Sequence, residues 1–421
     1  MTTHPLLAIH KAFHEGRHLG ITSVCSAHPL VIEAALSLGL ETGKTVLIEA
    51  TCNQVNQDGG YTGMTPERFR DFVAGIADKV GIGMDRIVLG GDHLGPNPWK
   101  HLPAEDAMEK AAAMIDAYVR AGFTKLHLDT SMGCAGEPAA LADAETAARA
   151  ARLASVAEAA FADAGTGQKP VYVIGTEVPV PGGATHGLDE LELTTPDAVR
   201  RTRDVHAEAF AAHGVDDAFS RVIALVVQPG VEFGHTDVIH FDARKAESLS
   251  AALHDFPGLV FEAHSTDYQT AEGLHALVAD GFAILKVGPW LTFALREALY
   301  ALDAIADVMD GHAPRGGLMT AMESCMQSDP GNWQKYYAGD ENTAWLQRHF
   351  SYSDRIRYYW PTPSATTAVD DLLARIGDRE VPGPVMSQYV PQIGSQTGPM
   401  TGREILIASV QRVLRLYDDA T

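Results

Sequence analysis

The chain has 421 residues, and with 46% hydrophobic and 20% charged residues it can bury a large core, which excludes a disordered protein. Its formal net charge of −22 at pH 7 excludes the basic face that nucleic acids and anionic membranes attract, so we expect neither as a partner. Because the first residues contain no long apolar run, we expect no secretory signal and no membrane anchor, and we predict a cytoplasmic protein.

Eight short β-branched runs, each ending in polar residues, predict eight β-strands. They cover residues 21–27, 45–51, 86–93, 125–131, 171–178, 221–229, 259–266 and 282–289. Ala- and Leu-rich segments with helical spacing follow the strands. A strand–helix unit repeated eight times predicts an α/β fold with a parallel sheet, for which a closed (β/α)8 TIM barrel is the economical arrangement. A doubly wound open sheet is the alternative, but it requires edge strands of different composition, which the sequence lacks.

The last part of the chain, residues 311–421, shows no such alternation. It begins with the Gly/Pro break "GHAPRGG", and the residues after this break are rich in aromatic and charged side chains. We therefore predict a barrel domain over residues 1–310 and a helical C-terminal extension over residues 311–421. A cluster of arginine and aromatic residues in the extension either anchors an interface or packs against the barrel. Its members are Arg355, Arg357, Tyr358, Tyr359 and Trp360.

Polar residues end nearly every predicted strand, and in such barrels the chemistry lies at the carboxyl ends of the strands. Imidazole and carboxylate groups that converge from separate strands are the ligands of a hard or borderline divalent cation. We predict a divalent metal site held by His93, Glu177 and His264, and His127 is a further candidate ligand because it shares a strand face with Asp129. The predicted catalytic carboxylates are Asp92, Asp129 and Glu262. As an alternative, Glu49 and Glu262 form a structural ion network with Lys286.

A polar loop follows the second predicted strand and ends at Thr65, a predicted N-cap, with Pro66 at the first helical position. Its amide side chains, including Asn53 and Gln57, can both donate and accept hydrogen bonds, which suits a polyhydroxylated substrate. A loop that only caps the helix is the alternative. Gln228, at the end of the sixth strand, is a further predicted substrate-binding residue.

Several long blocks resemble the GatZ/KbaZ family, the non-catalytic companion subunits of class II D-tagatose-1,6-bisphosphate aldolase. They include "SVCSAHPLVIEAAL", "LIEATCNQVNQDGGYTGMTPERF", "GGDHLGPNPW", "VVQPGVEFGH", "FEAHSTDYQT" and "LKVGPWLTFALREALYAL". The resemblance implies a barrel related to class II aldolases and a role in supporting the activity and stability of a catalytic subunit. Some members are labelled tagatose 6-phosphate kinases, but the G-x-x-x-x-G-K-[ST] loop is absent from this sequence, so we do not expect phosphoryl transfer.

The wider aldolase pattern also implies roles for single residues. Its acid–imidazole pair after strand three is similar to Asp92 and His93, and its strand-seven ligand resembles His264. At the strand-five ligand position this chain has Glu177 instead of a histidine, a shell that can still hold zinc, the ion we expect. The family's phosphate loops correspond to "AHSTD" and "LKVGP". They imply phosphate contacts from Ser265, Thr266, Lys286 and Gly288.

Two functions remain open, one implied by the family resemblance and one indicated by the acid and imidazole residues. The first, which we adopt, is the non-catalytic subunit that docks on a catalytic class II tagatose-bisphosphate aldolase in carbohydrate catabolism. The second is a metal-dependent 4-epimerase acting on a small sugar or sugar phosphate such as fructose or tagatose, in which Asp92 relays the C4 hydroxyl proton. In that reaction the C3–C4 bond breaks and re-forms with C4 inverted. Either function is compatible with a homo-oligomer.

Overall fold

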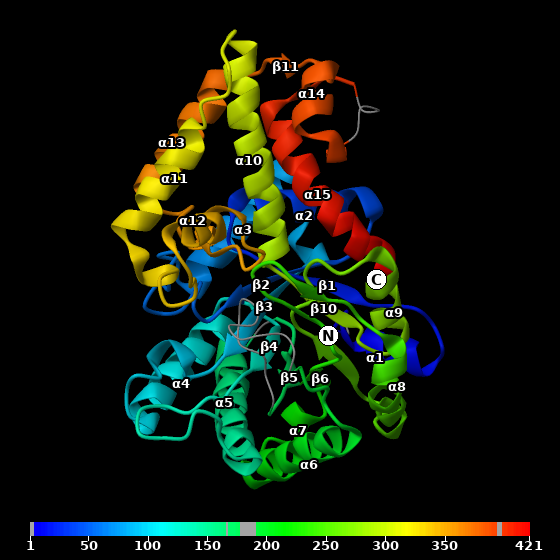
Figure 1. The fold of residues 1–421 in the computed structure, drawn as a ribbon. Helices are drawn as coiled ribbons and strands as arrows, with labels where there is room; N and C mark the ends of the chain where they lie inside the picture. The colour runs from blue at the N-terminus through cyan, green and yellow to red at the C-terminus, as the bar shows by residue number, and fades with distance from the viewer. Residues whose placement is uncertain (1–3, 166, 177–190, 394–397) are drawn as a thin grey trace.

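The computed structural model describes residues 4–165, 167–176, 191–393 and 398–421. Eight parallel strands close into a barrel in the order β1-β10-β9-β6-β5-β4-β3-β2 (Figure 1). In chain order they are β1 (Ile21–Cys25), β2 (Val46–Thr51), β3 (Ile87–Leu94), β4 (Lys125–Leu128), β5 (Val171–Ile174), β6 (Val222–Val227), β9 (Val260–Ala263) and β10 (Ile284–Val287). The predicted (β/α)8 barrel is confirmed.

Helices follow the strands around the barrel. They are α2 (Pro29–Thr42), α3 (Pro66–Val80), α4 (Ala104–Arg120), α5 (Asp143–Ala164), α6 (Pro196–Ala212), α7 (Asp216–Phe219), α8 (Ala243–Ala252), α9 (Ala271–Ala279) and α10 (Pro289–Met309). Thr65 caps α3 as predicted, because its side chain accepts a hydrogen bond from the Arg68 backbone N–H and Pro66 occupies the first turn. A hairpin of β7 (Glu232–Phe233) and β8 (Val238–Ile239) lies between β6 and α8, where we predicted no strands. None of the described helices is long and apolar enough to cross a membrane.

Side chains two residues apart on a strand share a face, so the barrel interior is built in layers. Towards the amino ends of the strands the interior is apolar and includes Leu47, Val88, Val260 and Ile284. Leu6 and Ile9, at the start of helix α1 (Leu7–His14), pack into this layer. Two residues further along the same strands lie Glu49, Gly90, Glu262 and Lys286. The polar residues of this second layer are buried at the carboxyl half of the barrel.

The chain beyond residue 310 is helical in its described part. It forms α11 (Gly317–Ser328), α12 (Glu341–Phe350), α13 (Pro363–Ile376), α14 (Gly383–Tyr389) and α15 (Gly402–Ala420), with a short strand pair, β11 (Glu380–Val381) and β12 (Met400–Thr401). Helix α15 lies along α10 and also packs on α2 and α9, while α11 and α13 lie side by side (Figure 1). One hydrophobic cluster runs from the barrel helices into these helices. The domain boundary at residue 310 stays a prediction.

Candidate functional site

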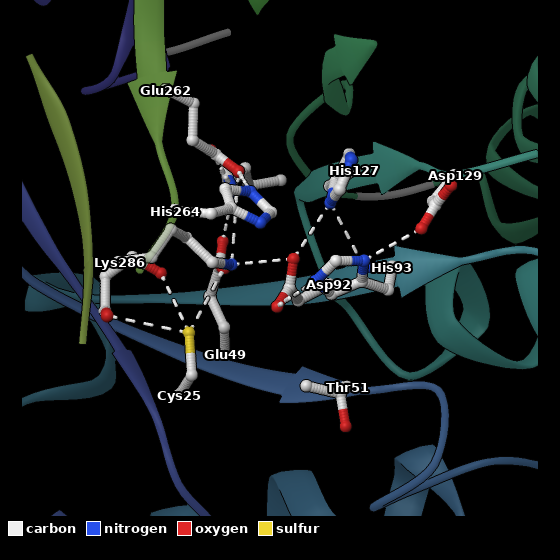
Figure 2. Close-up of polar contacts among 12 residues, drawn as sticks. Cys25, Glu49, Thr51, Asp92, His93, His127, Asp129, Glu262, His264 and Lys286 are labelled. Carbon is white, nitrogen blue, oxygen red and sulfur yellow. Dashed lines mark hydrogen bonds and ion pairs between the residues drawn. The ribbon is translucent and has the colours of Figure 1, made fainter. Parts of the chain in front are cut away.

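Four side chains converge at the carboxyl ends of the barrel strands (Figure 2). Asp92 and His93 lie near the end of β3, His127 lies on β4, and His264 directly follows β9. Each offers one possible ligand atom, and these atoms lie within 4.8 Å of one another. All four side chains are buried, and the three imidazole centroids lie 4.9 to 5.2 Å apart. The fold therefore brings together two of the three predicted metal ligands and the candidate ligand His127; Glu177 lies outside the described residues.

One nitrogen of each imidazole is held by a carboxylate. The pairs are His93 Nδ1 with Asp129 Oδ2 at 2.8 Å, His127 Nδ1 with Asp92 Oδ1 at 2.8 Å, and His264 Nε2 with Glu262 Oε1 at 2.9 Å. Metal-binding histidines are oriented in this way, by a carboxylate on the ring nitrogen that does not face the metal. The other nitrogen of His127, Nε2, is buried and has no hydrogen-bond partner among the described residues. This donor set fits a divalent cation.

Protonation of the cluster follows from burial and charge. Burial lowers the pKa of His264 to about 4, so its imidazole is neutral at neutral pH and can act as a ligand. Burial acts to raise the pKa of Asp92, but His93 and Lys286 outweigh it and hold the pKa of that carboxyl well below its usual range. Burial acts to lower the pKa of His93, and the carboxylates of Asp92 and Asp129 reverse the direction and raise it.

A buried ion network lies directly beneath the cluster. Lys125 Nζ lies 2.5 Å from Glu49 Oε1 and 2.6 Å from Glu262 Oε2, and all three side chains are fully buried. Lys286 pairs with Glu49 and lies 2.7 Å from Asp92 Oδ1. Gly90 makes room for this network, because a Cβ there would lie 2.6 Å from Glu49 Oε1. The alternative of an ion network for Glu49, Glu262 and Lys286 is therefore what the structure shows.

Lys125 belongs to this network but was not among the predicted site residues. Its signal in the sequence was its position, because it lies two residues before His127 on the same strand and so shares its face. The sequence predicts Lys125 as the first residue of the fourth strand, and the prediction gives it no role in the site. A lysine at an inward-facing position of a barrel strand needs buried acidic partners, since an unpaired buried charge is too costly.

Two residues of the site have left-handed backbone conformations without being glycine. The φ angles are 49° at His93 and 54° at Ser265. Such conformations cost about 1–3 kcal/mol each and concentrate at functional sites. His93 is the next-to-last residue of β3, where the pairing of β3 with β4 is irregular, and Ser265 is the second residue after β9. The His93 and His264 ring centroids lie 4.9 Å apart.

A cavity of about 100 Å³ opens onto the cluster, and Asp92, His93 and His264 line it. Four of the predicted substrate-binding residues also line it, namely Asn53, Ser265, Lys286 and Gly288. A larger cavity of about 630 Å³ shares Cys25, Gln54, Tyr61, Gly288 and Arg357 with it and extends between α2, α3 and α13. The two together provide more room than the inner cavity alone.

The other three predicted substrate-binding residues do not line the inner cavity. Gln57 donates a hydrogen bond to the Lys110 carbonyl, and the Gln228 side chain accepts hydrogen bonds from the backbone after β6. The Thr266 hydroxyl is buried and donates to the Lys286 carbonyl. In this structure all three side chains are engaged with the chain itself.

The comparisons with known proteins identify the family of the chain. Residues 6–421 match the family described as D-tagatose-1,6-bisphosphate aldolase subunit GatZ/KbaZ-like. The chain is 56% identical over 407 residues to D-tagatose 6-phosphate 4-epimerase of Agrobacterium fabrum, covering 96% of each protein. It is 49% identical over 418 residues to the D-tagatose-1,6-bisphosphate aldolase subunit GatZ of Salmonella enteritidis, covering 98% of this chain and 97% of that protein.

A solved structure is also similar to this chain over almost its whole length. The crystal structure of a "probable tagatose 6 phosphate kinase" from Sinorhizobium meliloti superimposes with a TM-score of 0.88 at 56% identity, covering 96% of this chain and 100% of that one. The resemblance seen in the sequence is thus confirmed over almost the whole length, and the chain belongs to the GatZ/KbaZ-like family.

Proposed function

We propose that this GatZ/KbaZ-like chain is a metal-dependent epimerase that inverts C4 of a ketohexose phosphate, tagatose 6-phosphate. The observation that carries this proposal is the convergence of His93, His127 and His264 with Asp92 within 4.8 Å at a cavity. A chain that acted only by docking would gain nothing from burying such a set, because desolvating charged groups is costly. The name of the 56% identical relative, a tagatose 6-phosphate 4-epimerase, supports the same reaction.

His93, His127 and His264 would hold the ion, and the nitrogen-rich donor set suits zinc or a similar borderline divalent cation. The ion would polarise the ketose carbonyl and so favour breaking of the C3–C4 bond. The predicted ligand Glu177 stays a prediction.

Asp92 is the residue that moves the proton in this proposal. Its low pKa keeps it ionised, and it faces the cavity. It accepts the proton of the C4 hydroxyl as the C3–C4 bond breaks and C4 becomes an aldehyde. After the retained aldehyde rotates, the C3–C4 bond forms on its other face and the proton returns to the C4 oxygen. No electrons are gained or lost overall, so no redox cofactor is needed.

Asp129 and Glu262, which we predicted to be catalytic, act here through the imidazoles that they contact. Their carboxylates hold His93 and His264 by hydrogen bonds of 2.8 and 2.9 Å. They are therefore positioning residues in this proposal. Lys286 offsets the charge of Asp92 from 2.7 Å and is already paired, so it also acts through the network.

The test is to purify the full chain, determine its metal content, and follow conversion of tagatose 6-phosphate to fructose 6-phosphate by NMR. We expect conversion that stops with a chelator and returns with one divalent metal. His93→Ala should lose both metal and turnover, whereas His213→Gln, a change at an exposed histidine after α6, should lose neither. Conversion by metal-free protein, or no conversion by metal-loaded protein, would overturn the proposal.

The subunit function predicted from the sequence is the second candidate, and it can coexist with the first. The family description and the GatZ relatives at 49% identity support it. To test it, the chain is added to a catalytic class II tagatose-bisphosphate aldolase subunit, and the cleavage rate and thermal stability of that subunit are measured. If His93→Ala still raises the aldolase rate, the subunit role does not depend on the metal cluster. If neither the wild-type chain nor His93→Ala changes the rate or the stability of the aldolase subunit, the subunit role is contradicted.

A further inference from the structure

The C-terminal extension reaches the cavity that holds the metal cluster. A short 3-10 helix, η6 (Arg355–Tyr358), precedes α13, and Arg357 and Tyr358 line the same cavity as His93 and His264. Arg355, in the same turn, is buried and stacks on Tyr336 instead. The extension therefore completes the wall of a cavity whose floor belongs to the barrel.

Arg357 differs in its surroundings from the other cation of this cavity. Lys286 lies among Glu49, Asp92 and Glu262, which compensate its charge. Arg357 has no carboxylate within ion-pair distance in residues 4–165, 167–176, 191–393 or 398–421. It is thus a positive charge in the cavity wall without a direct ion pair among the described residues, and the carboxylates of Asp354 and Asp267 act on it only from further away.

The guanidinium also has donors to spare. Its Nη1 donates to the carbonyls of Ser353 and Asp354, and its Nη2 donates to the Tyr358 hydroxyl at 2.9 Å. Within the described structure these bonds leave Nε and the second Nη2 hydrogen without an acceptor. A guanidinium presents its donors in a planar fork that matches phosphate oxygens, which an ammonium group does not.

One backbone group that the family resemblance implied for phosphate, the N–H of Gly288, is already in use. The N–H of Gly288 and the N–H of Trp290, at the start of α10, donate to Asp267 Oδ1 at 3.1 and 2.8 Å. An internal carboxylate therefore satisfies this helix terminus, and a substrate anion placed there would meet like charge. An anionic group in this cavity therefore needs a partner other than this helix terminus, and Ser265 and Arg357 both line the cavity.

Neighbouring elements hold Arg357 in place before any ligand arrives. Asp354 has a left-handed φ of 45° and accepts a hydrogen bond of 2.6 Å from the Thr292 hydroxyl of α10. Tyr358 packs edge-on against Tyr61 of the loop after β2, with ring centroids 5.1 Å apart. Such preorganisation lowers the entropic cost of binding.

We propose that Arg357, supplied by the C-terminal extension, binds the phosphate group of the substrate. This inference rests on the proposed function, because it assigns to that site the group that distinguishes a sugar phosphate from a free sugar. It places substrate recognition in the extension and metal binding in the barrel.

The test compares Arg357→Gln and Arg357→Lys with the wild-type full chain and with a matched control, Arg415→Gln. Arg415 lies on α15, lines neither cavity, is exposed and pairs with Glu41. Binding of inorganic phosphate and of tagatose 6-phosphate is measured by calorimetry, and turnover is measured with tagatose 6-phosphate and with tagatose. Thermal unfolding shows whether each variant is folded, and Arg357→Lys retains the charge if Arg357→Gln does not fold.

For Arg357→Gln we expect affinity for both phosphate ligands to fall about 10- to 100-fold, the value of a hydrogen-bonded charged group, while kcat/KM for tagatose stays within about threefold. Arg357→Lys should fall between, and Arg415→Gln should match the wild type. Unchanged phosphate affinity in Arg357→Gln, or an equal loss for tagatose and tagatose 6-phosphate, would overturn the inference. Phosphate binding that depends on Arg357 without any epimerisation would support the inference and refute the proposed function. Epimerisation of tagatose 6-phosphate at an unchanged rate in Arg357→Gln would support the proposed function and refute the inference.

Discussion

The two halves of the barrel interior are built on the same strands but have opposite chemistry. Leu47, Val88, Val260 and Ile284 fill the amino half with apolar side chains, and α1 closes it. Two residues further on, the carboxyl half holds Glu49, Glu262 and Lys286 and ends in the imidazole cluster. The difference indicates that one end of the barrel is built for stability, while in the proposed function the other end accepts costly buried charges because they position the reacting groups.

The comparison is sharpest at Asp92, where we expect the largest effect. Asp92→Asn keeps the shape but cannot accept a proton, so kcat for epimerisation should fall about 10²- to 10⁴-fold. The measurement is steady-state turnover at saturating metal, with metal content determined on the same sample. Asp116→Asn, which removes an exposed carboxylate paired with Arg120 on α4, is the control and should leave kcat unchanged. Full turnover in Asp92→Asn would remove this residue from the reaction.

The second prediction concerns the ion network. Lys125→Met leaves Glu49 and Glu262 buried with only Lys286 to compensate them, so the free energy of unfolding should fall by about 3–5 kcal/mol. Chemical denaturation measures this. Lys110→Met removes an exposed lysine, paired with Asp58, and should change stability by no more than about 1 kcal/mol. Equal losses in the two variants would mean that burial of the network carries no special cost.

The amino half gives a pH-dependent prediction through His4, which is buried beside Thr124 at the start of β4. Burial lowers the pKa of His4 to about 4, so between pH 6.5 and about 4 the unfolded chain binds a proton that the folded chain does not. Stability should therefore fall as the pH decreases through this range. In His4→Gln the slope should be smaller by up to about 1.4 kcal/mol per pH unit. An unchanged slope in denaturation curves measured from pH 7 to pH 4 would contradict this.

The smallest effect is expected in the apolar layer. Ile284→Val removes one buried methylene two residues before Lys286, so it should lower the free energy of unfolding by about 0.5–1.5 kcal/mol and leave kcat unchanged. Denaturation and turnover are measured on the same preparation. A large loss of kcat would show that the two halves of the interior are coupled rather than independent.

Much of the site was predictable because its signals are local. Asp92, His93, Glu262 and His264 end apolar runs, and the carboxyl ends of parallel strands meet at one rim of a barrel. His127 was recognisable as a candidate ligand from its strand face. Lys125 was missed because a charged residue beside an apolar run usually marks the boundary of a strand. Here the buried carboxylates of Glu49 on β2 and Glu262 on β9 compensate its charge.

The roles of Gln57, Gln228 and Thr266 depended on contacts that the sequence does not contain. Gln228 and Thr266 lie at the ends of strands and Gln57 in the loop after the second strand, as predicted, yet the side chain of each bonds to the chain itself. Gly288 lines the cavity, but Asp267 uses its N–H. The packing of whole elements determines which hydrogen-bond partner each polar group meets. Residue type and position in the sequence therefore predict where a polar group lies but not what it binds.

The sequence by itself determined the barrel and the rim at which its chemistry lies, because strand–helix alternation and polar strand ends are periodic features of neighbouring residues. Only the tertiary structure decided which groups meet there. Closure of the barrel brings β4 and β9 to one buried network, and the return of the chain through the extension carries Arg357 to a cavity formed far earlier in the sequence. Such contacts join residues distant along the chain, and they depend on how whole elements pack rather than on any local pattern.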